Sequence, residues 1–346
     1  MEGLRAGVIG LGMGRAHIRG YREHPQVDVA AIADIDGDRL QKVGDEYGIA
    51  SRYHTAEEML EKERLDIVSV ATPNAMHKPL AILAFEHGCH VLTEKPMAMS
   101  AKEGTEMISA AEKAGKRLMI NFSFRFTPQT MALKREVETG ILGDVYFGRT
   151  EWHRRRGIPK FGGWFGQKSL SGGGPLIDLG VHRLDLALWL MGYPKPVWVM
   201  GSAYSHIADR LASEEHVKFD VEDLAVGLIK FQNGATLEVE ASWAGNIGEK
   251  ELMTTKLLGT KGGLIQRNLD EGYGFEAEIY LERNGSLFDM RLSPASPPVP
   301  PAMYHFADAI FSDTPHIATG EEGLTVMKLL DAIYESSEKG TPIQIG

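Results

Sequence analysis

The chain has 346 residues, 43% apolar and 24% charged, and this length exceeds what one hydrophobic core usually supports, so two domains are expected. The net charge of −10 argues against partners such as duplex nucleic acid or an anionic membrane. A single cysteine, Cys89, excludes an internal disulfide framework and a multi-cysteine zinc site. No apolar run is long enough to span a bilayer, and a strand pattern begins already at Leu4, so we expect a cytoplasmic protein.

Short apolar runs alternate with helical patterns over the first 120 residues. Strands separated by helices of this length favour right-handed βαβ units, with a parallel sheet covered on both faces. Residues 1–122 are therefore predicted to form an α/β Rossmann domain with a doubly wound parallel sheet. The predicted strands are Leu4–Ile9, Val27–Ala33, Ile67–Ala71, Val91–Thr93 and Leu118–Ile120, and the clearest helical patterns are Arg39–Tyr47, Pro79–Glu86 and Ala101–Ala114.

The pattern changes after residue 122, where long strands joined by turns predominate. Residues 123–346 are predicted to form an α+β domain with an open, mostly antiparallel sheet. Asn233-Gly234 marks a hairpin within it, and the five prolines of Ser293–Pro301 indicate an extended connector. The predicted helices are Arg125–Thr139, Pro175–Leu190, Ala302–Phe311 and Glu321–Glu338, and the strands lie between Val197 and Leu292, including Leu224–Phe231 and Ala235–Trp243.

An open antiparallel sheet has a second face that helices do not necessarily cover. We expect a second copy of the chain to cover it, which predicts a homodimer or homotetramer assembled sheet on sheet. The alternative is a polar face in contact with solvent.

A glycine-rich loop follows the first predicted strand and precedes a helix. Its glycines permit a tight turn and close approach of a pyrophosphate to the backbone, and the helix N-terminus favours the phosphate charge. Asp34 ends the second strand, 22 residues beyond Gly12, where a carboxylate binds the adenosine ribose and repels a 2′-phosphate. We therefore predict NAD rather than NADP as the cofactor. The predicted contacts in this region are Gly10, Leu11, Gly12, Met13, Gly14, Asp34, Ile35 and Arg39.

The loop departs from the usual glycine spacing at one position. The third glycine of the pattern is expected at residue 15, which is Arg15. Gly14 and Ala16 flank it, and either would allow the close packing of helix on strand that the third glycine normally provides.

Two further strand ends carry polar residues at the edge of the sheet where ligands bind in this architecture. Ala71, Thr72 and Asn74 follow the third strand, and we expect them near the ribose or the pyrophosphate. His77 is either a further cofactor contact or a buried core histidine. Glu94 and Lys95 end the fourth strand, and Pro96 restricts the backbone of Lys95 to an extended direction.

Asp178 and His182 are four residues apart in the predicted helix Pro175–Leu190, so both lie on one helical face. Together with Lys95 they suit alcohol oxidation. A histidine accepts the hydroxyl proton as hydride leaves, an ammonium group stabilises the alkoxide, and a carboxylate orients the hydroxyl or the imidazole. No cluster of cysteine and histidine has the spacing of a metal site, so no metal is expected.

The pocket would be covered by the segment between residue 154 and the glycines near 172. Arg154 and Arg156 could hold an anionic group of the substrate, and Trp164 could stack on a sugar ring or on the nicotinamide. The alternative is that both arginines are solvated or form ion pairs between subunits.

In these motifs the chain resembles the glucose–fructose oxidoreductase, inositol dehydrogenase and rhizopine-catabolism (Gfo/Idh/MocA) family over essentially its whole length. The resemblance implies a Rossmann domain followed by an α/β domain whose open sheet mediates oligomerisation. It also implies that Lys95, Asp178 and His182 are the catalytic set, that His182 is the acid–base, and that the substrates are sugars, inositols and related polyols. The residues that carry it are Arg15-Ala16-His17 after the glycine loop, Ala71-Thr72-Pro73-Asn74 with His77, Glu94-Lys95-Pro96, Asn121 to Pro128, Gly172-Gly173-Gly174 with Asp178-Leu179-Gly180-Val181-His182, Trp243-Ala244 and Gly259-Thr260-Lys261-Gly262.

The leading hypothesis is therefore an NAD-dependent dehydrogenase that oxidises a ring secondary alcohol of a sugar, inositol or related polyol to the ketone. Two alternatives remain open. One is a redox-neutral enzyme that cleaves glycosides or exchanges groups with tightly bound NAD used transiently. The other is a nonenzymatic NAD(H)-binding regulator, although a protein without activity has no reason to retain all three candidate catalytic residues.

Overall fold

A computed structural model describes residues 3–159, 163–293 and 296–345. The chain forms two compact units, the first comprising residues 1–123 and 300–327 and the second residues 124–299 and 328–346. Within the described residues, no helix has the length and apolar character needed to cross a membrane.

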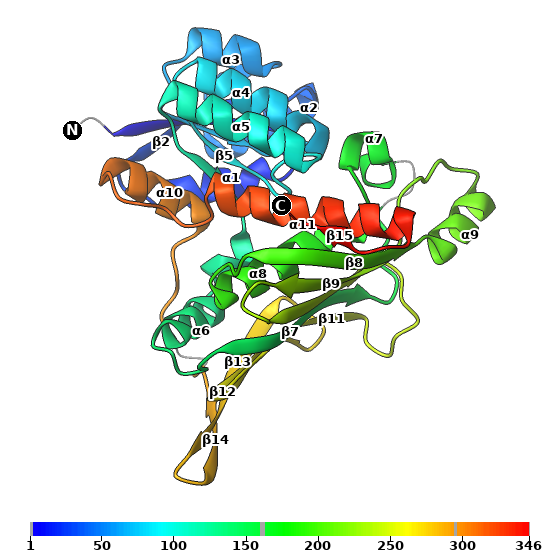
Figure 1. The fold of residues 1–346 in the computed structure, drawn as a ribbon. Helices are drawn as coiled ribbons and strands as arrows, with labels where there is room; N and C mark the ends of the chain where they lie inside the picture. The colour runs from blue at the N-terminus through cyan, green and yellow to red at the C-terminus, as the bar shows by residue number, and fades with distance from the viewer. Residues whose placement is uncertain (1–2, 160–162, 294–295, 346) are drawn as a thin grey trace. The chain divides into compact units, whose positions relative to one another are not determined.

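The first unit is built on a parallel sheet of six strands in the order β3-β2-β1-β4-β5-β6 (Figure 1). Every pair of neighbouring strands in it is parallel, so the predicted doubly wound sheet is confirmed. The short strand β3 was not predicted, because its three half-buried residues form no apolar run. The strands are β1 (Leu4–Ile9), β2 (Val27–Ala33), β3 (Ser51–Tyr53), β4 (Ile67–Val70), β5 (His90–Thr93) and β6 (Leu118–Ile120).

Most helices of the first unit begin at a polar side chain that caps the free backbone N–H groups of the first turn. Asp36 caps α2, Thr55 caps α3 and Ser100 caps α5. The helices α1 and α4 differ, since Met13 and Met76 precede them without a side-chain cap and their first turns hold no acidic residue. These helices are α1 (Gly14–Arg22), α2 (Gly37–Tyr47), α3 (Ala56–Lys62), α4 (His77–Glu86) and α5 (Ala101–Ala114), with a 3₁₀ turn, η1 (Asn74–Met76), before α4.

Residues 300–327 return to the first unit, whereas the sequence assigned everything after residue 122 to the second domain. The helix α10 (Ala302–Phe311) packs so closely on α1 that a Cβ at Gly20 would lie 3.0 Å from Met303. The backbone N–H of Ile120 in β6 donates to the carbonyl of Ala318 at 2.9 Å. The segment therefore completes the first unit. The predicted connector lies partly outside the described residues.

The second unit is built on a nine-stranded sheet in the order β14-β13-β12-β11-β7-β10-β9-β8-β15. All neighbours pair antiparallel except β7 and β10, which are parallel. The expected open, mostly antiparallel sheet is confirmed. Its strands are β7 (Val145–Arg154), β8 (Pro196–Tyr204), β9 (Leu224–Phe231), β10 (Thr236–Ser242), β11 (Glu251–Gly259), β12 (Gly262–Leu269), β13 (Gly274–Arg283), β14 (Ser286–Arg291) and β15 (Ile343–Gln344).

Three helical segments of the second unit differ from the sequence prediction. The helix α6 (Pro128–Glu138) begins later than predicted, because Thr127 caps it and Pro128 occupies its first turn. The predicted helix Pro175–Leu190 consists of a π-helical turn, η4 (Leu176–Gly180), followed by α8 (Val181–Met191). The helix α9 (His206–Glu215) interrupts a region predicted to hold strands alone. The remaining helical segments are η2 (Ser123–Phe126), η3 (Trp164–Gly166), α7 (Lys168–Ser171) and the second part of α11 (Gly320–Lys339).

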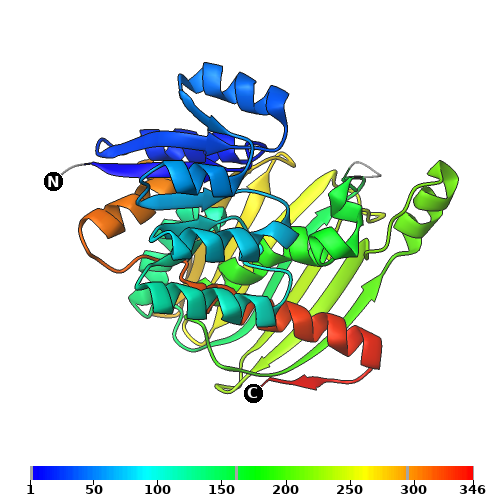
Figure 2. The same cartoon turned by 90° about the horizontal axis from the view of Figure 1, so that it is seen from above.

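Helices cover one face of the nine-stranded sheet (Figure 2). Thr150 of β7 donates to the Arg183 carbonyl of α8, and Ile333 of α11 lies within 2.7 Å of the position a Cβ at Gly201 of β8 would take. Among the described residues of this unit, no helix packs on the opposite face (Figure 1). Side chains that alternate with Thr150 along β7 therefore point to an uncovered face.

Candidate active site

The glycine loop of the first unit has the shape that a dinucleotide requires. Gly10 has a φ of +85°, and a Cβ there would lie 2.5 Å from the Ala71 carbonyl oxygen. A Cβ at Gly14 would lie 2.8 Å from Val8, so Gly14 supplies the close packing of helix on strand and Arg15 is tolerated. Nothing lies within 4 Å of the corresponding position at Gly12. Open space beside Gly12 and the uncapped N-terminus of α1 fit a pyrophosphate.

Asp34 organises the end of this loop. Its carboxylate accepts the backbone N–H of Leu11 at 2.7 Å and that of Asp36 at 2.9 Å, and Arg39 lies 3.3 Å away. A cavity of about 420 Å³ lies alongside, and Ile35 is 91% exposed. This arrangement fits the adenosine portion of NAD. The cavity is lined by Leu11, Gly12, Arg15, Asp36, Asp38, Arg39 and Lys42.

His77 is a buried core histidine, one of the two alternatives that the sequence left open. Its ring nitrogens lie 2.7 Å from the Pro96 carbonyl oxygen and 2.9 Å from the Thr72 carbonyl oxygen. Burial lowers the pKa of His77. The side chain therefore ties the end of β4 to the segment after β5.

Glu94 is a buried carboxylate at the end of β5. Its Oε1 lies 2.8 Å from Nε2 of His17 and accepts from the Asn121 amide at 2.6 Å, while His17 also contacts Ser69 at 2.9 Å. Burial alone would raise the pKa of Glu94, but the hydrogen bond and charge of His17, the Asn121 amide and the Lys95 charge lower it to about 2. Glu94 is thus a fixed anion that anchors the end of β5. Lys95 follows it directly and is joined to Pro96 by a cis peptide bond.

Asp178 belongs to the π-helical turn η4 of the second unit. Because π-helical hydrogen bonds join residues five apart, the α-helical spacing assumed from the sequence does not set its direction. The indole of Trp243 orients the Asp178 side chain instead, since Nε1 of Trp243 donates to Oδ2 of Asp178 at 3.1 Å. Trp243 is itself fully buried, so it holds the carboxylate from a rigid position.

His182 lies one turn further on, at the start of α8. Its ring packs edge-on against Phe124, with centroids 4.9 Å apart, and lies 5.7 Å from the Trp152 ring. The imidazole is 9% exposed. Aromatic packing therefore fixes the plane of a group that keeps one small accessible edge.

The charged neighbours of His182 on α8 have partners on other elements. Asp185 pairs with Arg125, at 2.9 Å from Nε, rather than with Arg183. Arg183 is fully buried against the rings of Phe124, Trp152 and Phe275, and burial lowers its pKa to about 9.

Glu222 holds the glycine segment that precedes η4. Its carboxylate accepts the backbone N–H of Gly174 at 2.8 Å and of Leu176 at 3.1 Å, and the Tyr334 hydroxyl donates to it at 2.8 Å. Burial raises the pKa of Glu222, against the effect of these three donors. A Cβ at Gly174 would lie 2.1 Å from the Glu222 carbonyl, which excludes any other residue there. Glu222 thus fixes the start of the segment that carries Asp178 and His182.

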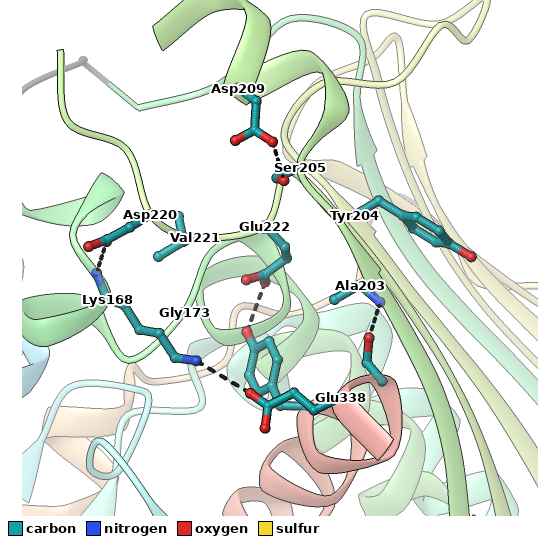
Figure 3. A pocket seen from close by; sticks show the side chains of 12 residues that line it. Lys168, Gly173, Ala203, Tyr204, Ser205, Asp209, Asp220, Val221, Glu222 and Glu338 are labelled. Carbon is teal, nitrogen blue, oxygen red and sulfur yellow. Dashed lines mark hydrogen bonds and ion pairs between the residues drawn. The ribbon is translucent and has the colours of Figure 1, made fainter. Parts of the chain in front are cut away.

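The same glutamate borders a cavity of about 310 Å³ in the second unit (Figure 3). Figure 3 shows Lys168 reaching toward Glu338 and Asp220 beside the backbone of Lys168. The Ser205 hydroxyl donates to Asp209 at 2.6 Å on the other side. None of Lys95, Asp178 and His182 lines this cavity.

The three candidate substrate contacts after β7 already have partners. Arg154 lies 2.8 Å from Glu251 and donates to the Tyr273 hydroxyl at 2.9 Å. Arg156 donates to the Gly245 carbonyl and to Asn246. Trp164 stacks on Phe165, with ring centroids 3.8 Å apart.

Arg154 has an electrostatic link to Asp178 of the candidate catalytic set. Burial would lower its pKa, but Glu251, Tyr273 and the charge of Asp178 raise it. Its positive charge is therefore largely offset within the protein.

The sequence did not identify His17, Asn121 or Glu222 as functional, although each positions a candidate. The detectable signal was polarity in an apolar context, since Glu222 lies two residues before the alternating strand β9 and His17 lies on the buried side of α1.

Comparison with known proteins agrees with this geometry. A family model described as "Oxidoreductase family, NAD-binding Rossmann fold" matches residues 4–122, and one described as "GFO/IDH/MocA C-terminal domain" matches residues 130–265. The chain is 33% identical over 353 residues to D-glucoside 3-dehydrogenase of Escherichia coli, covering 99% of this chain and 97% of that protein. It is 29% identical over 368 residues to D-apiose dehydrogenase of Rhizobium rhizogenes, covering 100% and 99%.

A solved structure is similar over the same extent. Aldose–aldose oxidoreductase from Caulobacter crescentus, complexed with glycerol, superposes with a TM-score of 0.84 at 27% identity, covering 99% of this chain and 100% of that one.

The nucleotide-binding sheet and the matched family models define the protein as an enzyme, an NAD-dependent oxidoreductase of the dehydrogenase type. It belongs to the GFO/IDH/MocA oxidoreductase family, as the motifs indicated. NAD as the cofactor is likewise confirmed.

Proposed function

We propose that the protein oxidises a ring secondary alcohol of a sugar, inositol or related polyol to the ketone. The observation that carries this proposal is the constellation in the second unit, where Trp243 orients Asp178 and two aromatic rings orient His182 on one helical segment. Similarity to a D-glucoside 3-dehydrogenase and a D-apiose dehydrogenase supports sugars as the substrate class.

Lys95, Asp178 and His182 are the proposed catalytic set. Bound NAD would supply the hydride acceptor. His182 would accept the hydroxyl proton as the C–H bond breaks, and the ammonium group of Lys95 would stabilise the negative charge that develops on the oxygen. Asp178, fixed by Trp243, would orient the reacting hydroxyl.

The cofactor is proposed to lie along the glycine loop, with its pyrophosphate at Gly12 and its adenosine ribose near Asp34. Contacts to the ribose or pyrophosphate from the strand ends of the first unit are part of the same proposal, and these residues are Ala71, Thr72, Asn74, Glu94 and Lys95.

The substrate is proposed to be uncharged where it meets Arg154. A guanidinium group that already pairs with Glu251 gains little from a substrate anion, since breaking the existing pair offsets the new one. Unchanged KM for uncharged sugars in Arg154→Ala and Arg156→Ala variants would place both residues outside the substrate site.

The test is the appearance of NADH when NAD is added to purified protein with a panel of inositols, aldoses and glycosides. NADP runs in parallel, and nicotinamide cofactor released by heat is measured. Turnover with NAD and a ketone product would support the proposal. Protein that releases nicotinamide cofactor on heating but turns over none of the panel would contradict it and favour redox-neutral catalysis.

The enzyme is further proposed to assemble as a homodimer or homotetramer through the uncovered face of the nine-stranded sheet. The half-buried apolar side chains Val226, Leu228 and Ile265 alternate with buried positions along their strands and so belong to that face.

A further inference from the structure

Three side chains with metal-binding atoms converge on the uncovered face of the nine-stranded sheet. Glu151 and His153 are two residues apart on β7 and thus point to the same face, away from Thr150 and Trp152. Glu240 of β10 lies directly opposite Glu151 in the register of the parallel pair. One ligand atom from each of the three lies within 4.8 Å of the other two.

The imidazole of His153 is available as a ligand. His153 is 8% exposed, and its buried Nε2 makes no hydrogen bond of normal geometry. That nitrogen lies 3.3 Å from Oε2 of Glu240. Two ligands of a tetrahedral zinc ion with bonds of about 2.0–2.1 Å are separated by roughly 3.3 Å, so this pair already has the required spacing.

Carboxylates exceed cations around the cluster. Arg149 lies 2.7 Å from Glu240, 3.6 Å from Glu151 and 3.9 Å from Glu238. One guanidinium group therefore pairs with three carboxylates. Within the described residues, the one other ion pair that these carboxylates make is that of Glu240 with His153. The Arg149 side chain is 48% exposed in the single chain, so close packing does not hold it against the carboxylates when another cation binds.

We propose that Glu151, His153 and Glu240 bind a divalent transition-metal ion, with Zn²⁺ favoured. One nitrogen and two carboxylate oxygens suit zinc, whereas magnesium and calcium prefer oxygen ligands alone. Water would complete the coordination, and Arg149 would leave the carboxylates. The site is distinct from the proposed reaction and does not depend on it, because its ligands face away from Trp152, which packs against His182.

The probe is Zn²⁺ itself, added by equilibrium dialysis to the full-length chain without a histidine tag after treatment with a chelator. Wild-type protein is expected to bind one more zinc ion per chain than His153→Gln or Glu240→Gln, whose affinity at this site should fall at least about tenfold. Glu238→Gln changes a neighbouring carboxylate on the same face that is not a ligand, and should bind as the wild type does. Arg149→Gln removes the competing cation and should bind zinc more tightly.

Co²⁺ provides a second readout that does not depend on stoichiometry. A tetrahedral Co²⁺ complex absorbs visible light, and this absorption should appear in wild type and in Glu238→Gln but not in His153→Gln. Thermal melting identifies variants that fail to fold, and light scattering records assembly separately. Equal zinc binding by wild type and by folded His153→Gln and Glu240→Gln would overturn the proposal, as would no zinc bound at all.

Discussion

A single buried charge, that of Glu94, fixes the strand end of the first unit that carries the candidate catalytic residue Lys95. Glu94 remains ionised inside the protein because His17, Asn121 and the backbone N–H of Lys95 surround it. Removing one member of this cluster leaves the remaining buried polar groups without a partner.

The depressed pKa of Glu94 makes its contribution to stability dependent on pH. With a folded-state pKa of about 2, below its unfolded value, the stabilisation is present in full above about pH 4.5 and is lost as the pH falls toward 2. Glu94→Gln should therefore melt at a lower temperature than wild type at pH 7, with a loss on the order of 3 kcal/mol. The difference should shrink at pH 3.5. Glu86→Gln, at an exposed position, is the control, and a constant difference for Glu94→Gln at both pH values would contradict the prediction.

The proposed proton transfer and charge stabilisation depend on two side chains. In Lys95→Ala and His182→Ala, kcat should fall by about 10²-fold or more, because the hydroxyl oxygen loses its cation or its base. Binding of NAD, followed by fluorescence titration, should survive in both. Lys102→Ala, on the exposed face of α5, should retain full activity. Wild-type kcat in either variant would remove that residue from the proposed mechanism.

At the scale of secondary-structure elements, the segment from Gly172 to Met191 depends on a contact from outside it. The π-helical turn η4 begins without a side-chain cap of its own. Glu222, which is distant in sequence, accepts the backbone N–H of Leu176 at the start of η4 and that of Gly174 just before it. The orientation of Asp178 therefore depends on a residue 44 positions later in the chain.

Glu222→Gln should lower kcat more than it lowers stability. The amide offers one acceptor oxygen in place of two, so one of the N–H groups of Gly174 and Leu176 loses its partner and the start of η4 shifts. We expect kcat to fall by about tenfold, in line with the effect of removing a residue that orients an active group, with the Kd for NAD unchanged. Tyr334→Phe removes only the hydroxyl donor and should have a smaller effect. Equal loss of activity and of folded protein would show a purely structural role.

Periodic elements could be predicted from the sequence, and elements without their own periodicity could not. Strand β9 and helix α10 match their predicted bounds to the residue, because alternation or helical spacing is a local property. β3 is too short to show a period, and α9 lies among strands. The partners of Glu222, Arg125 and His153 come from other elements, and no spacing along the chain reveals such pairs. The candidate catalytic residues could be proposed from the sequence because their motifs are local. The residues that position them come from distant parts of the chain and form no local motif.

At the scale of the whole molecule, the uncovered sheet face is the surface to test for assembly. Leu228→Glu places a charge among its apolar side chains and should convert the proposed dimer or tetramer to a monomer, measured by light scattering at micromolar concentration. Leu170→Glu changes an apolar side chain of α7 that is 37% exposed and should leave the oligomeric state unchanged. A monomeric wild-type protein would contradict the proposed assembly.

The division of the first unit into residues 1–123 and 300–327 has a consequence for how the protein is made. While the ribosome synthesises the 176 residues between the two parts, which takes roughly 9 to 35 seconds at typical elongation rates, the nascent Rossmann sheet lacks α10 on α1 and the Ala318 carbonyl on β6. An apolar helix surface and an unpaired strand edge are then exposed together, and such surfaces promote aggregation. The nascent chain should therefore require a chaperone until residue 327 has emerged, and arrested chains ending at residue 200 should be digested by protease faster than released full-length protein.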